Sequence, residues 1–181
     1  LIGPGTASFA NYSSYSRGLN ALVVDLVGRA GAPPISAADF EFRIGNSDFP
    51  ATWTQAPSPE SLSVRWGAGV DGSDRLTITW ADGSIVSQWL EVTVKTSVAN
   101  LLQPDVFYFG NAVADTGNSP TDANITSSDY IATNLAMGTT NLPLTSYLDY
   151  NRDGTVTRAD VDILVAATLV ESLEVIDLVL S

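Results

Sequence analysis

Residues 149–160 read Asp-Tyr-Asn-Arg-Asp-Gly-Thr-Val-Thr-Arg-Ala-Asp, and this stretch decides how the C-terminal part of the chain folds. Oxygen-bearing side chains occupy positions 1, 3, 5 and 12, and glycine occupies position 6, where we expect little room for a Cβ atom. Ca2+ binds about six to eight oxygen atoms at once, and this spacing wraps the chain around one point. We therefore predict a calcium loop, with these ligands: Asp149, Asn151, Asp153, Asp160 and the backbone carbonyl of Thr155.

The same stretch also has a simpler interpretation, as a polar surface turn that binds no metal. Thr157 and Asp160 fit the capping box of a helix that begins there, and Thr126 and Asp129 fit a second one. Capping and metal binding are compatible, because one carboxylate can do both at a helix start. Val156 is apolar, and we expect its side chain to face the core and not the metal.

A degenerate copy of the loop lies upstream, at residues 115–129. Aligning Ile125 with Val156 places Asp129 on Asp160, but the first half of the copy is longer and Ala123 replaces the glycine. We predict a second, weaker calcium site in this copy. Its candidate ligands are Asp115, Asn118, Asp122, Asn124 and Asp129.

Each loop is followed by a helical pattern, over residues 129–137 and 160–170. The first pattern ends before Gly138, and glycine is a common helix stop. No amphipathic helix precedes either loop, since the segment before Asp149 is short and interrupted by Pro143. The chain therefore repeats a loop and then a helix, which differs from the helix–loop–helix unit of an EF-hand.

Paired loop-and-helix units with aspartate at position 12 resemble a type I dockerin, whose paired calcium loops are called F-hands. The resemblance covers residues 105–170. The runs Asp-Val-Phe-Tyr-Phe-Gly-Asn (105–111) and Asp-Thr-Gly-Asn-Ser (115–119) are similar to C-terminal modules of large exported bacterial proteins.

This resemblance implies calcium at both loops, an extracellular or cell-surface location, and attachment to a protein partner such as a cohesin-like protein. It also implies that loop positions 10 and 11 contact the partner, and these are Ser127, Ser128, Arg158 and Ala159. Because the serine pair differs from the Arg-Ala pair, two equivalent binding modes are not expected.

The first hundred residues read as strands separated by turn residues. Asp82-Gly83 is predicted to close a hairpin between Trp80 and Ile85. Short strands at this spacing are typical of an antiparallel β-sandwich. The strands are expected at residues 21–27, 39–44, 61–66, 75–80 and 85–94, with further strands at 6–10 and 106–109.

The expected fold class is therefore mainly β with a small α part. We predict a β-sandwich domain at residues 1–110 and the dockerin-like calcium-binding module at residues 111–181, packed together with no flexible linker.

The aromatic residues of the first half suggest that this half binds carbohydrate. Trp80 and Trp89 lie within predicted strands, so we expect them to fill the core. Trp53 and Trp66 lie near loops and are the candidates for a sugar-stacking surface, together with Tyr12 and Tyr15.

The charge of the chain is strongly negative and unevenly distributed. The formal net charge is -12, and residues 105–181 carry eleven acidic and two basic residues, against nine and six in residues 1–104. Phosphate binding needs clustered Lys and Arg, so nucleic acid is a poor partner. The absence of Cys and His excludes disulfides and histidine-dependent sites. No run of about twenty apolar residues is present, so no membrane span is expected.

A catalytic role is not expected either. Glycosidases need two placed carboxylates, and the early glutamates Glu41, Glu60 and Glu91 sit in no suggestive motif. The sequence favours a noncatalytic extracellular calcium-binding module for protein–protein attachment. One alternative is a carbohydrate-binding accessory module of a polysaccharide-degrading exoenzyme. Another is a structural subunit of a cell-surface assembly, in which residues 171–181 add a strand or a contact.

Overall fold

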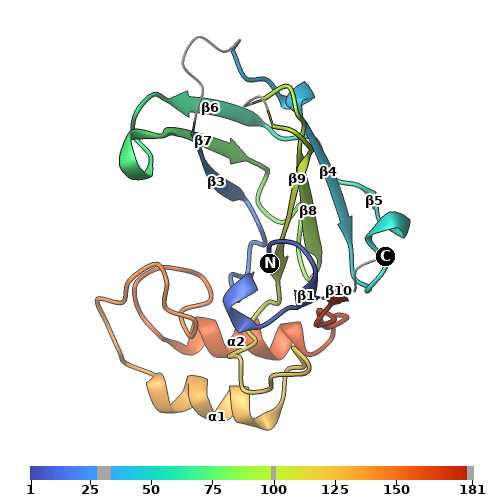
Figure 1. Cartoon of the computed structure of the whole chain (residues 1–181). Coiled ribbons are helices and arrows are strands. Elements are labelled where there is room, and N and C mark those ends of the chain that lie inside the picture. The colour runs from blue at the N-terminus through green and yellow to red at the C-terminus, as the bar shows by residue number, and fades with distance from the viewer. Residues whose placement is uncertain (28–33, 99–100, 179–181) are drawn as a thin grey trace.

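The computed structural model describes residues 1–27, 34–98 and 101–178, and these form a mainly β molecule with a small α part (Figure 1). Within these ranges, ten strands form three sheets, and two α-helices lie together beyond one end of the larger sheets. No helix in the described ranges is long and apolar enough to cross a membrane. Short 3-10 helices at Phe9–Asn11, Ala37–Asp39, Pro50–Thr52 and Val70–Gly72 lie in the connections.

The larger sheet has five strands in the order β2-β9-β8-β4-β5. Their bounds are Tyr12–Ser13 (β2), Asp105–Asn111 (β9), Trp89–Val94 (β8), Phe40–Gly45 (β4) and Thr54–Gln55 (β5). Neighbouring strands are antiparallel except β2, which pairs parallel to β9. The prediction of a purely antiparallel sandwich is therefore wrong at this edge, where the N-terminal segment runs alongside the chain that leads into the first loop.

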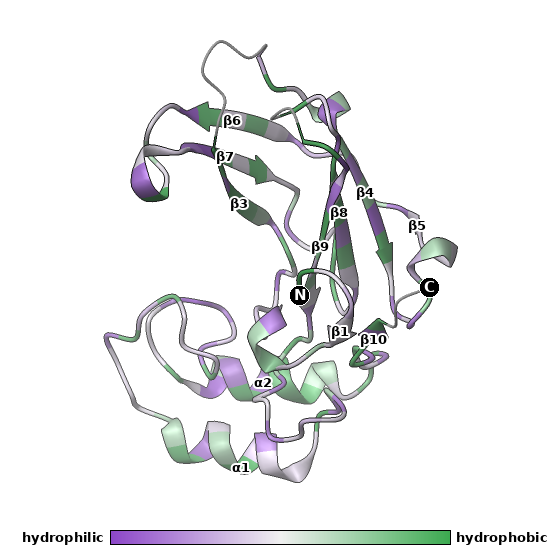
Figure 2. Cartoon of the chain, viewed as in Figure 1, coloured by the Kyte–Doolittle hydropathy of each residue, from purple (hydrophilic) through white to green (hydrophobic). Residues whose placement is uncertain are grey.

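A second sheet of three strands packs against the inner face of the first. It has the order β3-β7-β6, with bounds Ala21–Leu26 (β3), Asp74–Thr79 (β7) and Ser61–Arg65 (β6). Apolar residues recur along the strands, as the green segments in Figure 2 show, and the buried ones form one core between the two sheets. The main core contains Leu22, Phe40, Leu76, Ile78, Trp80, Leu90, Val92 and Phe107.

The predicted hairpin at Asp82-Gly83 is wrong, because β7 and β8 belong to different sheets. Ile85 is fully buried, and its carbonyl accepts a hydrogen bond from Leu19 at 2.9 Å, so this segment packs on the N-terminal segment. The Asp82 carboxylate accepts from Arg17 at 2.7 Å. The turn therefore carries the chain from one sheet to the other, and β8 begins only at Trp89.

The outer face of the five-stranded sheet is covered by the C-terminal segment. Its last described residues form β10 (Asp177–Leu178), which pairs with β1 (Gly5–Thr6). The predicted strand at residues 6–10 is confirmed only at its first residue, since a 3-10 helix follows at Phe9–Asn11. The predicted tail strand forms within its own chain, and residues 179–181 lie outside the described ranges. The core on this face contains Trp53, Trp89, Tyr108, Ala112, Leu173, Ile176 and Leu178.

The chain passes from β9 into the first loop through a well-bonded segment. The side chain of Asn111 is fully buried and donates to the carbonyls of Ser13 at 3.0 Å and Tyr15 at 2.8 Å. Helices α1 (Ser127–Ala136) and α2 (Arg158–Ala167) follow. Beneath them lies a third, smaller core of Ala114, Tyr150 and Leu164.

Candidate metal centre

The second loop, residues 149–160, is closed by hydrogen bonds from its own backbone to its two buried carboxylates. Asp149 accepts from the amides of Asp153 at 3.2 Å and Gly154 at 2.8 Å. Asp160 accepts from the amides of Tyr150 at 2.8 Å and Thr157 at 2.9 Å. These bonds turn positions 1 and 12 towards the inside of the loop, while Val156 is buried in the core as predicted.

The side chains at positions 3 and 5 lie on the rim of this loop and bind each other. Asn151 accepts from the Asp153 amide at 3.0 Å and donates through Nδ2 to the Asp153 carboxylate at 2.9 Å. The Thr155 hydroxyl donates to Asp153 at 2.7 Å, and with Asn151 it holds the pKa of Asp153 below its usual value. A cation bound between these two side chains needs the Asn151 amide oxygen beside the Asp153 carboxylate, where Nδ2 now lies.

Position 154 requires glycine because of its backbone conformation and not because the surroundings are crowded. Its φ is +88°, in the left-handed region that side chains disfavour. A Cβ there would meet only the Leu142 carbonyl oxygen, at 3.9 Å, which is an ordinary contact. The prediction that position 6 has little room for a Cβ atom is therefore wrong.

Arg152, at loop position 4, ties this loop to the N-terminal segment. Its guanidinium donates to the carbonyls of Ser146 and Asp149 and, at 3.2 Å, to the Ser14 hydroxyl. It also lies 5.6 Å from the centre of the Tyr15 ring. Nothing in the motif at residues 149–160 indicates this link, because the partner residues are more than 130 positions away.

In the first loop, the carboxylate at position 12 accepts hydrogen bonds from backbone amides of its own loop, as Asp160 does in the second loop. Asp129 is fully buried and accepts from the amides of Thr116 at 3.0 Å and Thr126 at 2.7 Å, in the same places as the two amides that bind Asp160. Burial alone raises the pKa of Asp129, but the hydroxyls and amides of both threonines outweigh it and lower the pKa. Both predicted capping boxes are confirmed.

Asp115 carries an unsatisfied oxygen in the interior of the first loop. Its Oδ2 accepts from the Tyr12 hydroxyl at 2.7 Å and the Gly117 amide at 3.2 Å. Its Oδ1 is buried and has no hydrogen-bond partner in the described chain. Burial raises the pKa of Asp115. A buried oxygen without a partner is costly, and a bound cation would satisfy it.

The other candidate ligands of the first loop are held on its outer side. Asp122 accepts from the Ser119 hydroxyl at 2.7 Å and from Asn124 Nδ2 at 2.9 Å. Asn118 donates to the Thr126 hydroxyl at 3.1 Å. Across the described residues, no three His, Cys, Asp or Glu side chains gather in a geometry that could hold a metal ion.

The two loops exchange partners, which the sequence did not predict. The second loop pairs with the segment after α1, since Val156 donates to the Thr139 carbonyl at 3.0 Å and Thr155 forms a bridge with Thr140. The first loop pairs with the segment after α2, through a bridge between Ala123 and Leu173. Each loop is thus held by the chain that follows the other loop's helix.

The four candidate partner-binding residues begin the two helices. Ser127, Ser128, Arg158 and Ala159 are all exposed, and Arg158 forms an ion pair with Asp162 at 2.7 Å. Hydrophobic residues (green in Figure 2) occur along both helices. The exposed ones on the helices are Tyr130, Ile131, Leu135 and Val165, and Met137 and Leu169 are exposed just after them.

The tryptophans do not form one surface. Trp80 and Trp89 are buried, as predicted. Trp53 is only 7% exposed, donates to the Ser47 carbonyl at 3.1 Å and packs edge-on against Tyr108, so it offers little ring area to a sugar. Trp66, at the end of the other sheet's β6, is 64% exposed.

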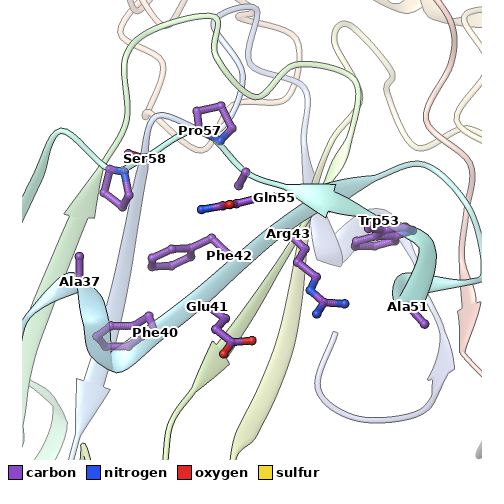
Figure 3. Close-up of a pocket in the computed structure, with 12 residues that line it drawn as sticks. Ala37, Phe40, Glu41, Phe42, Arg43, Ala51, Trp53, Gln55, Pro57 and Ser58 are labelled. Atoms are coloured by element: carbon purple, nitrogen blue, oxygen red, sulfur yellow. The ribbon is translucent and has the colours of Figure 1, made fainter.

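A pocket of about 670 Å³ lies along β4 and β5, beside Trp53 (Figure 3). Arg43 extends between Trp53 and Glu41, and the Glu41 carboxylate lies on the solvent side of the strand, 3.6 Å from Lys95. Phe42, which forms its apolar wall, also packs into the main core. The aromatic residues that line this pocket therefore belong largely to the edge of the main hydrophobic core.

Comparison of the chain with models of known protein families, with curated proteins and with solved structures gave no match.

Proposed function

We propose that this chain is a noncatalytic extracellular calcium-binding module of the type I dockerin kind, which attaches its parent protein to a protein partner. The observation that supports this best is the common plan of the two loops. In each, a buried aspartate at position 12 starts a helix and accepts from two backbone amides of its own loop, Asp129 in the first and Asp160 in the second.

The residues present fit calcium in their chemistry. All the candidate donors are oxygen atoms, which suit a hard cation. Among the described residues, the buried Oδ1 of Asp115 has no hydrogen-bond partner, and Asp149 and Asp160 keep further lone pairs inside the second loop. When bound, Ca2+ supplies a positive charge that joins these oxygens across each loop. It also offsets part of the -12 net charge.

The attachment surface that we propose lies on the two helices. Exposed apolar side chains on these helices, among them Leu135 (83% exposed) and Val165 (48% exposed), are the kind of groups that a protein partner buries, and Leu169 (88% exposed) follows α2 directly. The exposed pairs Ser127–Ser128 and Arg158–Ala159 flank this surface at the helix starts. A cohesin-like protein is the partner type that we propose.

Neither alternative function receives comparable support. The carbohydrate alternative named Trp53 and Trp66, but Trp53 is buried and Trp66 follows a strand of the other sheet, so the two do not form one stacking surface. The assembly alternative relied on the tail pairing with another chain, and residues 177–178 pair with β1 of their own chain.

The decisive variant is Asp153→Ala, compared with wild type by thermal unfolding in calcium and in chelator. In chelator the variant loses the bonds that the Asp153 carboxylate accepts from Asn151 and Thr155, and in calcium it also loses a metal ligand. It should therefore melt slightly below wild type in chelator and well below it in calcium. At a calcium concentration about 100-fold above Kd, the metal adds about 2.7 kcal/mol to the wild type. Most of this is lost if the variant cannot bind.

The matched control is Asp105→Ala, which removes one exposed carboxylate outside both loops and should respond to calcium as wild type does. Isothermal titration of the chelator-treated protein counts the bound ions directly. If wild type melts at one temperature with and without chelator, and titration shows no heat, the calcium proposal is wrong.

A further inference from the structure

A second pocket lies where the N-terminal segment meets the second loop. Its volume is about 640 Å³, within the range of about 300–1,000 Å³ that small-ligand sites occupy. One wall comes from residues 9–20 and the other from residues 144–152. Aromatic and hydroxyl side chains dominate the lining, which includes Phe9, Tyr12, Ser13, Tyr15, Thr145 and Tyr147.

The two walls are fixed to one another by hydrogen bonds. The Ser14 hydroxyl donates to the Tyr147 carbonyl at 2.9 Å, and the Ser16 amide donates to the Tyr150 carbonyl at 2.9 Å. Arg152 adds a bond to Ser14 at 3.2 Å. The pocket is therefore formed before any ligand enters, which lowers the entropic cost of binding.

Aromatic surface and hydroxyl groups are both available inside this pocket. Phe9 packs edge-on against Tyr12 at 5.4 Å and Tyr147 at 5.8 Å, which fixes the orientation of the rings. Tyr147 is 48% exposed. The hydroxyls of Tyr15 and Tyr147 take part in no hydrogen bond within the described part of the chain.

The charges of the lining restrict the class of ligand. The pocket has no acidic side chain, although the chain carries a net charge of -12, so a cation finds no partner there. Its one cationic residue, Arg152, already uses three of its N–H groups on two carbonyls and a hydroxyl, so it has fewer donors left for an anion. A wholly apolar ligand would bury the free hydroxyls without partners, at a cost.

A neutral ligand with an apolar ring face and hydroxyl groups at its edge satisfies all of these conditions. We propose that this pocket binds a neutral saccharide, with a sugar ring against Tyr147 and Tyr15 and its hydroxyls bonded to the free phenols. The C–H groups of a sugar face are attracted to the negative face of an aromatic ring. This site contains Tyr12 and Tyr15, which the sequence indicated for sugar stacking, but neither Trp53 nor Trp66, and it does not depend on partner attachment.

The test is a titration of the whole chain, in calcium, with three neutral hexasaccharides: β-1,4-linked glucose, xylose and mannose. Binding is followed by amide chemical shifts in two-dimensional NMR. At least one sugar should shift signals from residues 9–20 and 144–152. Tyr147→Ala should then raise Kd at least tenfold, and Tyr147→Phe, which keeps the ring and loses the hydroxyl, should raise it less.

Trp66→Ala is the matched control, because it removes an exposed aromatic ring from the other sheet, and it should leave Kd unchanged. Circular dichroism establishes that each variant is folded. The proposal is overturned if none of the three sugars binds, if the shifted signals lie elsewhere, or if Trp66→Ala abolishes binding while Tyr147→Ala does not. It is also overturned if a proline-rich peptide shifts these signals and the sugars do not.

Discussion

Asp25 shows how a single carboxylate holds a loop against a strand. Arg75 binds it with two nearly parallel bonds, from Nε at 2.7 Å and Nη2 at 2.8 Å, and the Val70 amide adds a third at 3.0 Å. The Arg75 bonds are the main reason that the pKa of Asp25 falls from 3.8 to about 2. The folded state thus favours the ionised carboxylate more than the unfolded state does.

We predict that this contribution disappears in acid. A lowered pKa stabilises the fold above the unfolded value of 3.8, and the stabilisation is lost as the pH falls through about 2. Asp25→Asn should therefore melt well below wild type at pH 7, and the difference in Tm should shrink steadily between pH 4 and pH 2. Thermal unfolding in chelator across this pH range measures it.

Glu60→Gln, at an exposed position, is the control and should match wild type throughout. A difference between Asp25→Asn and wild type that stays constant from pH 7 to pH 2 would contradict the assigned role of the ion pair.

At the scale of elements, both helices begin with a threonine cap, but the two cap hydroxyls form different sets of hydrogen bonds. The Thr157 hydroxyl accepts from the Ala159 amide at 3.2 Å and takes part in the capping box with Asp160. The Thr126 hydroxyl accepts from the Ser128 amide and from Asn118, and donates to Asp129 at 2.8 Å. The first cap is therefore part of a larger network.

We predict an unequal cost for removing the two caps. Thr157→Ala should lower the free energy of unfolding by about 1 kcal/mol, the usual cost of a lost helix cap. Thr126→Ala should cost more, because Asp129 and Asn118 also lose a partner. Urea unfolding in chelator gives both values, and each variant is the control for the other. A larger loss in Thr157→Ala would show that the network around Asp129 adds nothing.

The success of the sequence predictions depended on the range of the interactions involved. The helix starts and Val156 were predicted correctly, because capping and apolar patterning act within a few residues. The hairpin at Asp82-Gly83 was wrong, since the burial of Ile85 against the N-terminal segment overrides a local turn signal.

In the candidate metal centre too, short-range contacts were predictable from sequence and long-range contacts were not. The inward carboxylates Asp149 and Asp160 follow from the loop motif itself. The Tyr12–Asp115 bond joins residues 103 positions apart, and the Arg152–Ser14 bond joins residues 138 apart. No spacing rule reaches that far, so these contacts needed the structure. Whether either loop binds calcium stays a prediction.

At the scale of the whole molecule, the C-terminal segment joins the helical part to the larger sheet. Trp89 donates to the Glu174 carbonyl at 2.7 Å, and Asn46 exchanges bonds with Ser172 and Glu174. Leu173 and Ile176 are almost completely buried against the sheet. The predicted boundary at residue 110 therefore separates two parts that share a core.

We predict that removing residues 172–181 destabilises the whole chain and not the loops alone. The deletion uncovers Trp89 and takes three apolar side chains from the core, each worth about 1.5–3 kcal/mol. The expected loss is on the order of 5 kcal/mol. It should appear equally in tryptophan fluorescence, which reports the sheets, and in helical circular dichroism.

The shorter deletion of residues 179–181 is the control, because it leaves the contacts of residues 172–178 in place. A melting curve in which the sheets keep their wild-type Tm after the longer deletion would show that the two parts are independent.

The pairing of β1 with β10 has a mechanical consequence. Gly5 pairs with Leu178 and Thr6 with Asp177, so the two strands run in opposite directions, while residues 1 and 2 before them pair with Tyr108 and Phe107 of β9. Tension drawn between Gly5 and Leu178 opens this ladder one bond at a time and does not load its bonds together in shear. The β1–β10 seam should give way at low force and release slack while the larger sheets still hold.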